Sequence, residues 1–389
     1  MANEHIGRLE KVGLGKESTP GTGVAATFWL PKEESLFLPK TEKAKDLGAY
    51  GIIDELYDSQ TVLQMTEVSI KGIFREVYGG SFLLAALGTE QLCLKITRAA
   101  GAGVFVVGET VTGGTSAATG VIRRLDSQNL FYITVTTGTF NASESFTGGT
   151  SGATGTCTHN SALRTHLFTR LNSNNHPSFS IFGVDDVGTF RSTYCLLESL
   201  ELACEVGKYL NYDTKWMGKK EASSSGTPSF ATDENHFLAK HGTLKLATAL
   251  SGLTAASATE IKSFKMSIQK NLEAYQAFGS DDLASIHNKQ FSVSGEITGL
   301  FKSTVLKDLN AASTKRAMRM EFINTDATIG STGNPILTIE FARCSFENWT
   351  KKSGNDELVM ETIGFTAEFS ASAGETMAIL LQNARTTVY

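Results

Sequence analysis

The chain has 389 residues, of which 41% are hydrophobic and 19% are charged, and its formal net charge is −5 at pH 7. This length allows two or three domains with sizeable cores. The small negative charge argues against broad electrostatic capture of nucleic acid. The 37 glycines, together with many Ser and Thr, favour short strands joined by turns over a helical bundle.

Apolar segments and cysteines indicate where the protein is made. No apolar run approaches the roughly 20 residues of a membrane-spanning helix, and the N-terminus lacks the basic start and apolar core of a signal peptide. We therefore expect synthesis in the cytoplasm and no membrane partner. The cysteines are scattered and never spaced as CxxC, which predicts reduced, mostly buried thiols instead of a disulfide framework or a zinc knuckle. They are Cys93, Cys157, Cys195, Cys204 and Cys344.

The first hundred residues begin with a glycine-rich stretch. Four glycines and a proline lie between Gly13 and Gly23, and this composition predicts that the first thirty residues form an extended, mobile arm. Alternating apolar residues predict strands at 66–71 and 74–78. The apolar segment 81–87 predicts a short helix, with Gly88 placed to end it.

A repeat is the clearest internal signal. Residues 105–120 recur as residues 140–155, and both copies contain a Glu, a Thr-Gly-Gly-Thr-Ser run and a closing Ala-Thr-Gly. Between the copies, 130–136 is rich in β-branched and aromatic residues and predicts a strand. Each copy predicts a strand, a glycine-rich turn and a second strand. Two such units can close a small sandwich or barrel that buries the Phe, Val and Ile positions.

The remainder of the chain predicts a succession of strands. Its apolar residues alternate with Thr, Glu and Ser, which is typical of sheets with one buried and one solvated face. A loop is predicted at 171–177, and the polar segment 217–235 predicts a long loop that is functional or becomes ordered against a partner. A short helix is predicted at 305–310. The predicted strands are 179–183, 194–206, 259–268, 290–298, 316–323, 336–341, 344–346 and 361–369.

The segments on either side of the repeat resemble each other weakly. Lys45–Tyr50 aligns with Lys270–Tyr275 at an offset of 225, and Val68-Ser69 aligns with Val293-Ser294 at the same offset. A duplication of one β domain and a chance similarity are left as equal alternatives.

The predicted fold class is therefore mainly β, a sandwich or barrel with a short helix and a small inserted β domain. We divide the chain into a first β segment with an extended N-terminal arm at 1–100, the inserted repeat module at 101–160, and a second β domain at 161–389.

No motif predicts catalysis, and we predict no catalytic, cofactor-binding or metal-binding residues. Gly13-x-Gly15-Lys16 lacks the four-residue spacer of a phosphate loop. The seven histidines show no HExxH or HxH pattern and are expected at the solvated surface. No GxSxG elbow is present. We therefore predict that the protein is not an enzyme.

Clustered charges have ordinary interpretations. The acidic pairs Asp185-Asp186 and Asp281-Asp282 predict turns, because Asp side chains hydrogen-bond to nearby backbone; a glycosidase pair or a Ca²⁺ site is the weaker alternative. Lys215-Trp216 and Lys219-Lys220 are too few for a nucleic-acid platform and are expected in a solvated loop.

The opening phrase provides a resemblance to a known family. Residues 15–25, Gly-Lys-Glu-Ser-Thr-Pro-Gly-Thr-Gly-Val-Ala, resemble the start of siphophage major tail tube proteins, many of which begin with GxExxxGTxxA. The layout of 1–100 and 161–389, with strands, polar loops and a short helix, is also similar to that family. The repeat is similar to small β inserts common in phage virion proteins.

The resemblance implies a structural function. Subunits would join their sheets side by side into a ring lined by one β-barrel, and stacked rings would form the conduit for DNA ejection. A duplicated chain implies a trimeric ring with pseudo-sixfold symmetry, and a single domain implies a hexamer. Loops at 11–35 and 210–235 would order on the neighbouring ring.

The resemblance also implies partners and a location. The partners would be copies of the chain, other tail proteins (tape measure, terminator and distal tail), and DNA in transient, non-specific passage. The protein would be assembled in the host cytoplasm into the virion tail, for which we favour a non-contractile type.

Two other functions compete with the tube subunit. A virion surface decoration or receptor-binding protein would use the repeat module as its adhesive domain. A polysaccharide depolymerase would need paired buried carboxylates in a cleft, and the sequence offers no persuasive pair. Because the module interrupts a larger β assembly, we expect it to project from the outside of a tube.

Overall fold

The computed structural model describes residues 6–51, 53–330 and 332–389. These residues form a mainly β structure with two α-helices, α1 (Gly79–Leu87) and α2 (Val305–Ala311), and two 3₁₀ helices, η1 (Ala239–His241) and η2 (Leu250–Gly252). The strands before residue 160 are β1 (Lys11–Lys16), β2 (Phe28–Leu30), β3 (Glu34–Asp46), β4 (Asp58–Ile73), β5 (Gly88–Ala102), β6 (Thr110–Gly113), β7 (Thr119–Ser127), β8 (Leu130–Thr137), β9 (Ser143–Gly148) and β10 (Thr154–Thr158). The later strands are β11 (Arg164–Arg170), β12 (Phe179–Val184), β13 (Thr189–Glu205), β14 (Asn211–Lys219), β15 (Ala222–Ser223), β16 (Gly242–Ala247), β17 (Ala258–Thr259), β18 (Ser263–Gln269), β19 (Leu272–Gln276), β20 (Leu283–Asn288), β21 (Ser292–Leu300), β22 (Arg316–Ile323), β23 (Ile336–Lys352), β24 (Met360–Ala367) and β25 (Met377–Asn383).

Eight strands form one continuous antiparallel array, which we call the main sheet. Its order is β3-β4-β14-β13-β18-β21-β24-β23, with β13 and β23 contributing their C-terminal parts, residues 196–205 and 344–352. Along each strand the side chains alternate between the core and the opposite face. In β4, for example, Val68 and Ile70 are buried, whereas Ser69 is partly exposed.

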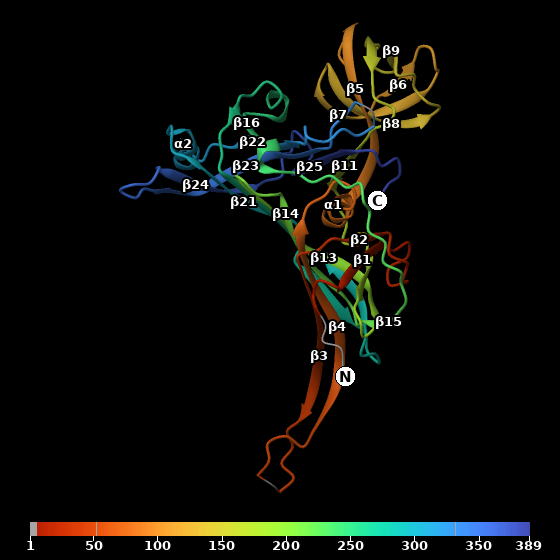
Figure 1. Ribbon diagram of the computed structural model, residues 1–389, viewed down its shortest axis with the longest axis vertical. Helices are drawn as coiled ribbons and strands as arrows, with labels where there is room; N and C mark the ends of the chain where they lie inside the picture. Colours follow the sequence, from red (N-terminus) through yellow and green to blue (C-terminus); the bar gives the residue numbers. More distant parts are fainter. Residues whose placement is uncertain (1–5, 52, 331) are drawn as a thin grey trace.

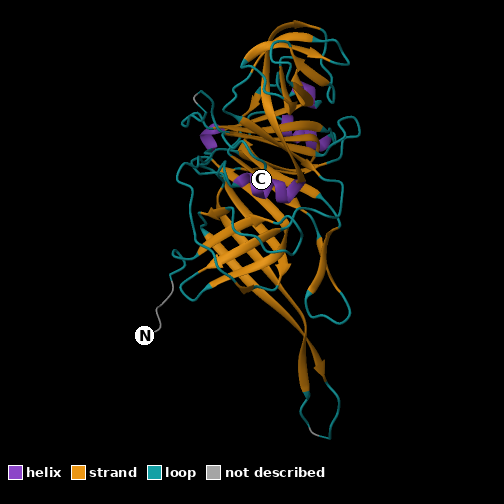
Figure 2. Ribbon diagram, turned by 90° about the vertical axis from the view of Figure 1, so that its right-hand side faces the viewer, coloured by secondary structure: helices purple, strands orange, loops and turns teal. Residues whose placement is uncertain are grey.

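A second layer covers the buried face of the main sheet. It comprises β2, β1 and β12 on one side, and β11, β25, β22 and β16 on the other. β13 and β23 are long enough to belong to both layers, because their N-terminal parts pair with β12 and with β22 and β25, respectively. Figure 2 shows strands of the two layers crossing in the lower part of the body. One hydrophobic core lies between them.

The helix α1 is buried in this core along its whole length. The predicted helix is thus confirmed, and Gly88 ends it with a left-handed backbone at φ 92°. The strand predicted at 74–78 is wrong. Phe74 and Tyr78 are fully buried, but this segment turns into the helix, so its apolar residues contact the core from a turn.

The repeat folds into a small β structure with its own core. Strands β6 to β10 and the end of β5 pair with one another, and they lie at one end of the molecule (Figure 1). The buried residues of this core include Phe105 and Phe140, which start the two copies, and Ile133 between them. Each copy forms the predicted strand, turn and strand. We refer to residues 101–160 as the module.

The two copies of the repeat complete each other's turns. Glu144 Oε2, from the second copy, accepts hydrogen bonds from the backbone N–H groups of Thr115 and Ser116 at 3.0 Å each. Glu109 Oε2, from the first copy, accepts one from the Ser151 N–H at 3.0 Å. Both carboxylates are 5% exposed. The repeated Glu therefore has a structural function that the alignment of the copies did not reveal.

Candidate assembly surface

The face of the main sheet that points away from the core is polar. Its central strands carry Ser, Thr, Lys, Asp and Glu side chains, and charges of opposite sign are paired. Lys71 Nζ lies 3.6 Å from Asp213, and Lys265 Nζ lies 2.8 Å from Glu201 across the β13–β18 joint. This face is a long, solvated surface with mixed charge.

The main sheet ends in two edges without a partner strand. At one end, β3 pairs with β4, and no described strand covers its other edge. At the other end, residues 345–352 of β23 pair with β24, and their other edge is likewise without a described partner strand. An open edge presents unpaired N–H and C=O groups and is a template for pairing with another chain.

The main sheet consists of two equivalent halves of four strands. In the first half the order is β3-β4-β14-β13, and in the second it is β18-β21-β24-β23. In each half the second strand of this order, β4 or β21, is followed by a short helix and then by another strand. The halves are joined by antiparallel pairing of β13 with β18.

The strand pairings also correct part of the sequence alignment between the halves. The alignment of Val68 with Val293 is kept, because they lie in β4 and β21, the corresponding strands of the two halves, and both are buried in the core. Lys45 and Lys270 are not equivalent. Lys45 is exposed near the end of β3, whereas Lys270 follows β18 and is 1% exposed.

Lys270 is a buried lysine at the joint between the halves. Its Nζ donates to the Ala85 carbonyl at the end of α1 and to His176 Nδ1, 3.0 Å away. Burial lowers the pKa of Lys270 to about 7. Burial and the charge of Lys270 lower the pKa of His176 to about 3. His176 is therefore neutral at neutral pH, and its Nδ1 accepts the hydrogen bond from Lys270.

The expectation of solvated histidines is therefore wrong for three of the seven. His166, His176 and His241 are buried. His166 Nδ1 lies 2.7 Å from Glu90 Oε1, and its Nε2 lies 3.0 Å from Asn383 Oδ1. A histidine far from any motif gives no sequence signal for such burial, because its partners come from distant strands.

The N-terminal phrase is a fixed part of the fold, which corrects the prediction of a mobile arm. Residues 1–5 lie outside the described residues. β1 pairs with β12 and β2, and Val12 and Leu14 are fully buried. Gly13, Gly15 and Lys16 thus belong to a strand, so neither a phosphate loop nor a loop spanning 11–35 is present.

Glu17, the acidic residue of the phrase, is buried, and its carboxylate accepts four hydrogen bonds. Its carboxylate accepts hydrogen bonds from the Ser178 and Ser180 hydroxyls at 2.7 and 2.9 Å. It also accepts the Tyr194 N–H at 2.9 Å and the Gly21 N–H at 2.8 Å. A Cβ at Gly15 would lie 2.2 Å from the Ala25 carbonyl oxygen. The phrase therefore folds a turn back onto β12 and β13.

The β3–β4 hairpin extends beyond the body of the molecule (Figure 1). Near its tip, the rings of Tyr50 and Tyr57 stack with centroids 3.8 Å apart, and both are more than half exposed. Leu47, Ile53 and Leu56 are also exposed there. Apolar side chains gathered at the end of an arm are typical of a contact site.

A buried ionic network attaches the module to the body. Arg124 of β7 is paired with Glu340 of β23, and its Nη1 lies 2.9 Å from Glu375 Oε1. Arg319 of β22 also binds Glu340, and it lies 3.4 Å from Asp126 of β7. Glu340 is 1% exposed. These contacts hold the module in a fixed position against β22 and β23.

The charged clusters considered in the sequence have structural functions. Asp185 Oδ1 accepts the N–H groups of Val187 and Gly188, so its pair forms a turn as predicted. The expectation of a solvated loop at Lys215-Trp216 is wrong. Both residues lie in β14, and Trp216 is 1% exposed in the core. The five cysteines are free and buried, as predicted.

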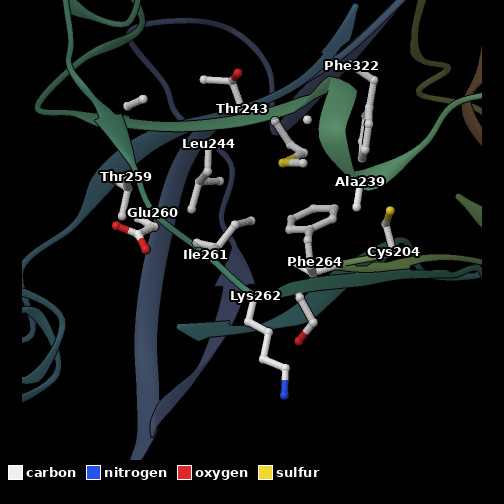
Figure 3. A pocket seen from close by; sticks show the side chains of 15 residues that line it. Cys204, Ala239, Thr243, Leu244, Thr259, Glu260, Ile261, Lys262, Phe264 and Phe322 are labelled. Carbon is white, nitrogen blue, oxygen red and sulfur yellow. The ribbon is translucent and has the colours of Figure 1, made fainter. Parts of the chain in front are cut away.

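A cavity of about 340 Å³, with both apolar and polar residues in its lining, lies between β16, β17, β18 and β22. Leu244, Ile261 and Phe264 face into it, whereas Lys262 points away (Figure 3). Polar groups do not converge there. Among the described residues, no group of three His, Cys, Asp or Glu side chains could hold a metal ion.

No helix within the described part of the chain is both long and apolar enough to cross a membrane.

Comparison with known proteins identifies the family. A family model described as phage tail tube protein matches residues 7–367. A comparison with curated proteins finds no match. Because the family match spans nearly the whole chain, the protein belongs to the phage tail tube protein family and is a structural protein of the virion tail.

Proposed function

We propose that the chain assembles with copies of itself into stacked rings that form the tail tube, the conduit for DNA ejection. The observation that carries this proposal is the main sheet, which has a polar face and two edges without described partner strands. Edge-to-edge pairing would extend the sheet from chain to chain and close it into a barrel. The role is structural, without catalysis.

We propose three chains per ring. Each chain already contains two equivalent four-strand units, so a trimer has pseudo-sixfold symmetry. A closed sheet of about 24 strands, at roughly 4.8 Å per strand, has a circumference of about 115 Å and a diameter of about 37 Å before strand tilt. This leaves room for side chains and a duplex roughly 20 Å wide. A hexamer of chains would double that diameter.

The polar face of the main sheet would line the lumen. Many Lys or Arg side chains free to bind phosphate would hold DNA in place. On this face Lys71 and Lys265 are paired with acidic side chains of neighbouring strands. Such a surface would let DNA pass without being retained.

The β3–β4 hairpin would contact the neighbouring ring in the stack. Its exposed tip, with Tyr50 and Tyr57, would bury apolar area there. Of the loop predicted at 210–235, residues 211–219 and 222–223 form β14 and β15, so only the stretch 224–235 would add to this contact. Assembly in the host cytoplasm, with tape measure, terminator and distal tail proteins as further partners, belongs to this proposal.

The division of the chain into 1–100, 101–160 and 161–389 also remains a proposal. The separate core of the module supports it. The module is joined to the main sheet through the second layer, away from the polar face, which would place it outside a tube.

Microscopy of the purified, concentrated protein tests the proposed function. Negative-stain images should show rings or hollow tubes with a lumen wider than about 20 Å, and native mass spectrometry should give a trimer of the 41.8 kDa chain. A hexamer would contradict the three-chain ring. Dispersed monomers at every concentration would contradict self-assembly.

A further inference from the structure

The antiparallel pairing of β13 with β18 joins the two halves within one chain. We call such a pairing a joint and use it as the template for the pairing between chains. Where β13 meets β18, Leu200 lies opposite Ile268 on the core side, and Glu201 lies opposite Ser267 on the polar side. This joint connects the last strand of the first half to the first strand of the second half. In a ring, the next joint of this kind would connect β23 of one chain to β3 of its neighbour.

The strand pairings identify the equivalent residue on β3. Ile268 lies opposite Val293 of β21, and Phe37 lies opposite Val68 of β4. Val68 and Val293 are equivalent, so Phe37 corresponds to Ile268. One residue away, Leu36 corresponds to Ser267 by the same pairings.

The equivalent residue on β23 follows from the other two strands of each half. Leu200 lies opposite Thr214, which lies opposite Ile70. Phe346 lies opposite Phe365, which in turn lies opposite Gly295. Ile70 and Gly295 each come two residues after the equivalent valines, so Phe346 corresponds to Leu200. Glu347 then corresponds to Glu201.

We propose that β23 of one chain pairs antiparallel with β3 of the next, with Phe346 opposite Phe37 and Glu347 opposite Leu36. This inference rests on the proposed function, and its partner is a second copy of the chain. The antiparallel sense is required, because strand direction alternates through all eight strands of the main sheet.

The open edge of β3 carries exposed apolar side chains where the register places residues 345 and 347 of β23. Leu36 and Leu38 are 53% and 42% exposed on β3, and a paired neighbour would cover part of this apolar area.

The test is a cysteine cross-link in the full-length protein. Positions 36 and 347 are exposed, so L36C and E347C leave the core unchanged, and the five native cysteines are buried and free. Directly opposite residues have Cβ atoms about 4.5–5.5 Å apart, whereas diagonal neighbours are about 7–8 Å apart. A disulfide requires about 3.5–4.5 Å, so only the direct pair is close enough to cross-link readily.

Under mild oxidation, the double variant L36C/E347C should convert from monomer to covalent dimers and trimers on a non-reducing gel. Mixing L36C protein with E347C protein should give covalent dimers only, because each chain then carries a single introduced cysteine and can form one bond. The single variants alone should remain monomeric on the gel. A second pair, L38C with S345C, is equivalent by the same register and provides an independent measurement.

The outcomes separate this inference from the proposed function. Rings or tubes in the microscope together with cross-linking at both pairs would support the proposed joint. Rings or tubes without cross-linking at either pair, or with equal cross-linking in the register-shifted pair L38C/E347C, would overturn the joint while leaving the tube function intact. Absence of any assembly in the unmodified protein would overturn both.

Discussion

Glu109 and Glu144 each close the turn that belongs to the other's repeat. Their carboxylates bind the backbone and hydroxyl groups of Ser151 and Ser116, respectively, 42 and 28 residues away along the chain. Because of this exchange, neither copy of the repeat can complete its turn alone. The module is therefore one folding unit built from two copies, and its stability depends on both carboxylates.

Replacing Glu144 by Gln should destabilise the module. Burial acts to raise the pKa of Glu144, but the hydrogen bonds from Ser116, Thr115 and Asn141 outweigh it and lower the pKa. The substitution removes charge-assisted hydrogen bonds, so we expect a loss of about 1–3 kcal/mol in the free energy of unfolding of the module. Hydrogen exchange of the module amides should measure it.

The same carboxylates predict an acid dependence. Their pKa values are lowered in the folded state, so their stabilisation is complete above the unfolded pKa and is lost as pH falls through the lower folded value. The double variant E109Q/E144Q should lose this part of the acid dependence. The exposed Glu42→Gln change is the matched control, and an unchanged pH profile in the double variant would contradict the assignment.

Replacing Glu17 by Gln should loosen the N-terminal segment. Four hydrogen bonds from Ser178, Ser180, Tyr194 and Gly21 converge on this carboxylate, and a neutral amide can accept only at its single oxygen. We expect the unfolding free energy to fall by about 2–4 kcal/mol, with faster proteolysis between residues 17 and 28. Ser18→Ala, at an exposed neighbour, should leave both measurements unchanged. Equal proteolysis of the two variants would show that the hydrogen bonds to Glu17 do not hold the N-terminal segment.

Stability should rise with pH above neutrality because of Lys270. Its pKa is about 7 in the folded protein against an ordinary 10.5, so between these values the unfolded chain binds a proton that the folded chain lacks. The free energy of unfolding then increases with pH by up to about 1.4 kcal/mol per pH unit. In K270M, denaturant unfolding at pH 7 to 10 should show a flatter profile. The control K289M changes an exposed lysine paired with Glu273 and should keep the wild-type slope. A wild-type slope in K270M would be evidence against the lowered pKa of Lys270.

Arg124 and Glu340 should be energetically coupled. Among the described residues, removing Arg124 leaves the buried Glu340 carboxylate with Arg319 as its cationic partner, and breaking a buried pair costs about 3–5 kcal/mol. R124M should therefore lower the free energy of unfolding of the wild-type protein by more than it lowers that of the E340Q variant. A double-mutant cycle by thermal unfolding measures this coupling, and additive losses would refute it.

Deleting the module should leave tube formation intact only if the charges of Glu340 and Arg319, its ionic partners on the body, are also removed. Removal of 101–160 takes away Arg124 and Asp126 and exposes Glu340 and Arg319 on the body. We expect the deletion combined with E340Q and R319Q to form tubes visible by negative stain. A folded deletion protein that forms no tubes would place the module in the tube wall.

Local patterns in the sequence determined many of the elements. Alternation of apolar and polar residues predicted β21, β22 and β24, because a strand with one buried face has a period of two. The apolar segment before Gly88 predicted α1, and the two copies of the repeat predicted the paired turns of the module. These features depend on residues close together in the chain, and a single sequence contains that information.

The pairing of distant segments was decided only by the tertiary structure. The glycine-rich start looked mobile because nothing within it shows that Glu17 will meet Ser178, Ser180 and Tyr194, more than 160 residues away. The burial of Lys270 between α1 and His176 has the same cause. The two equivalent halves of the main sheet are likewise defined by the order in which strands from distant parts of the chain pair. Register depends on which strands meet, and that is set by the packing of the whole core.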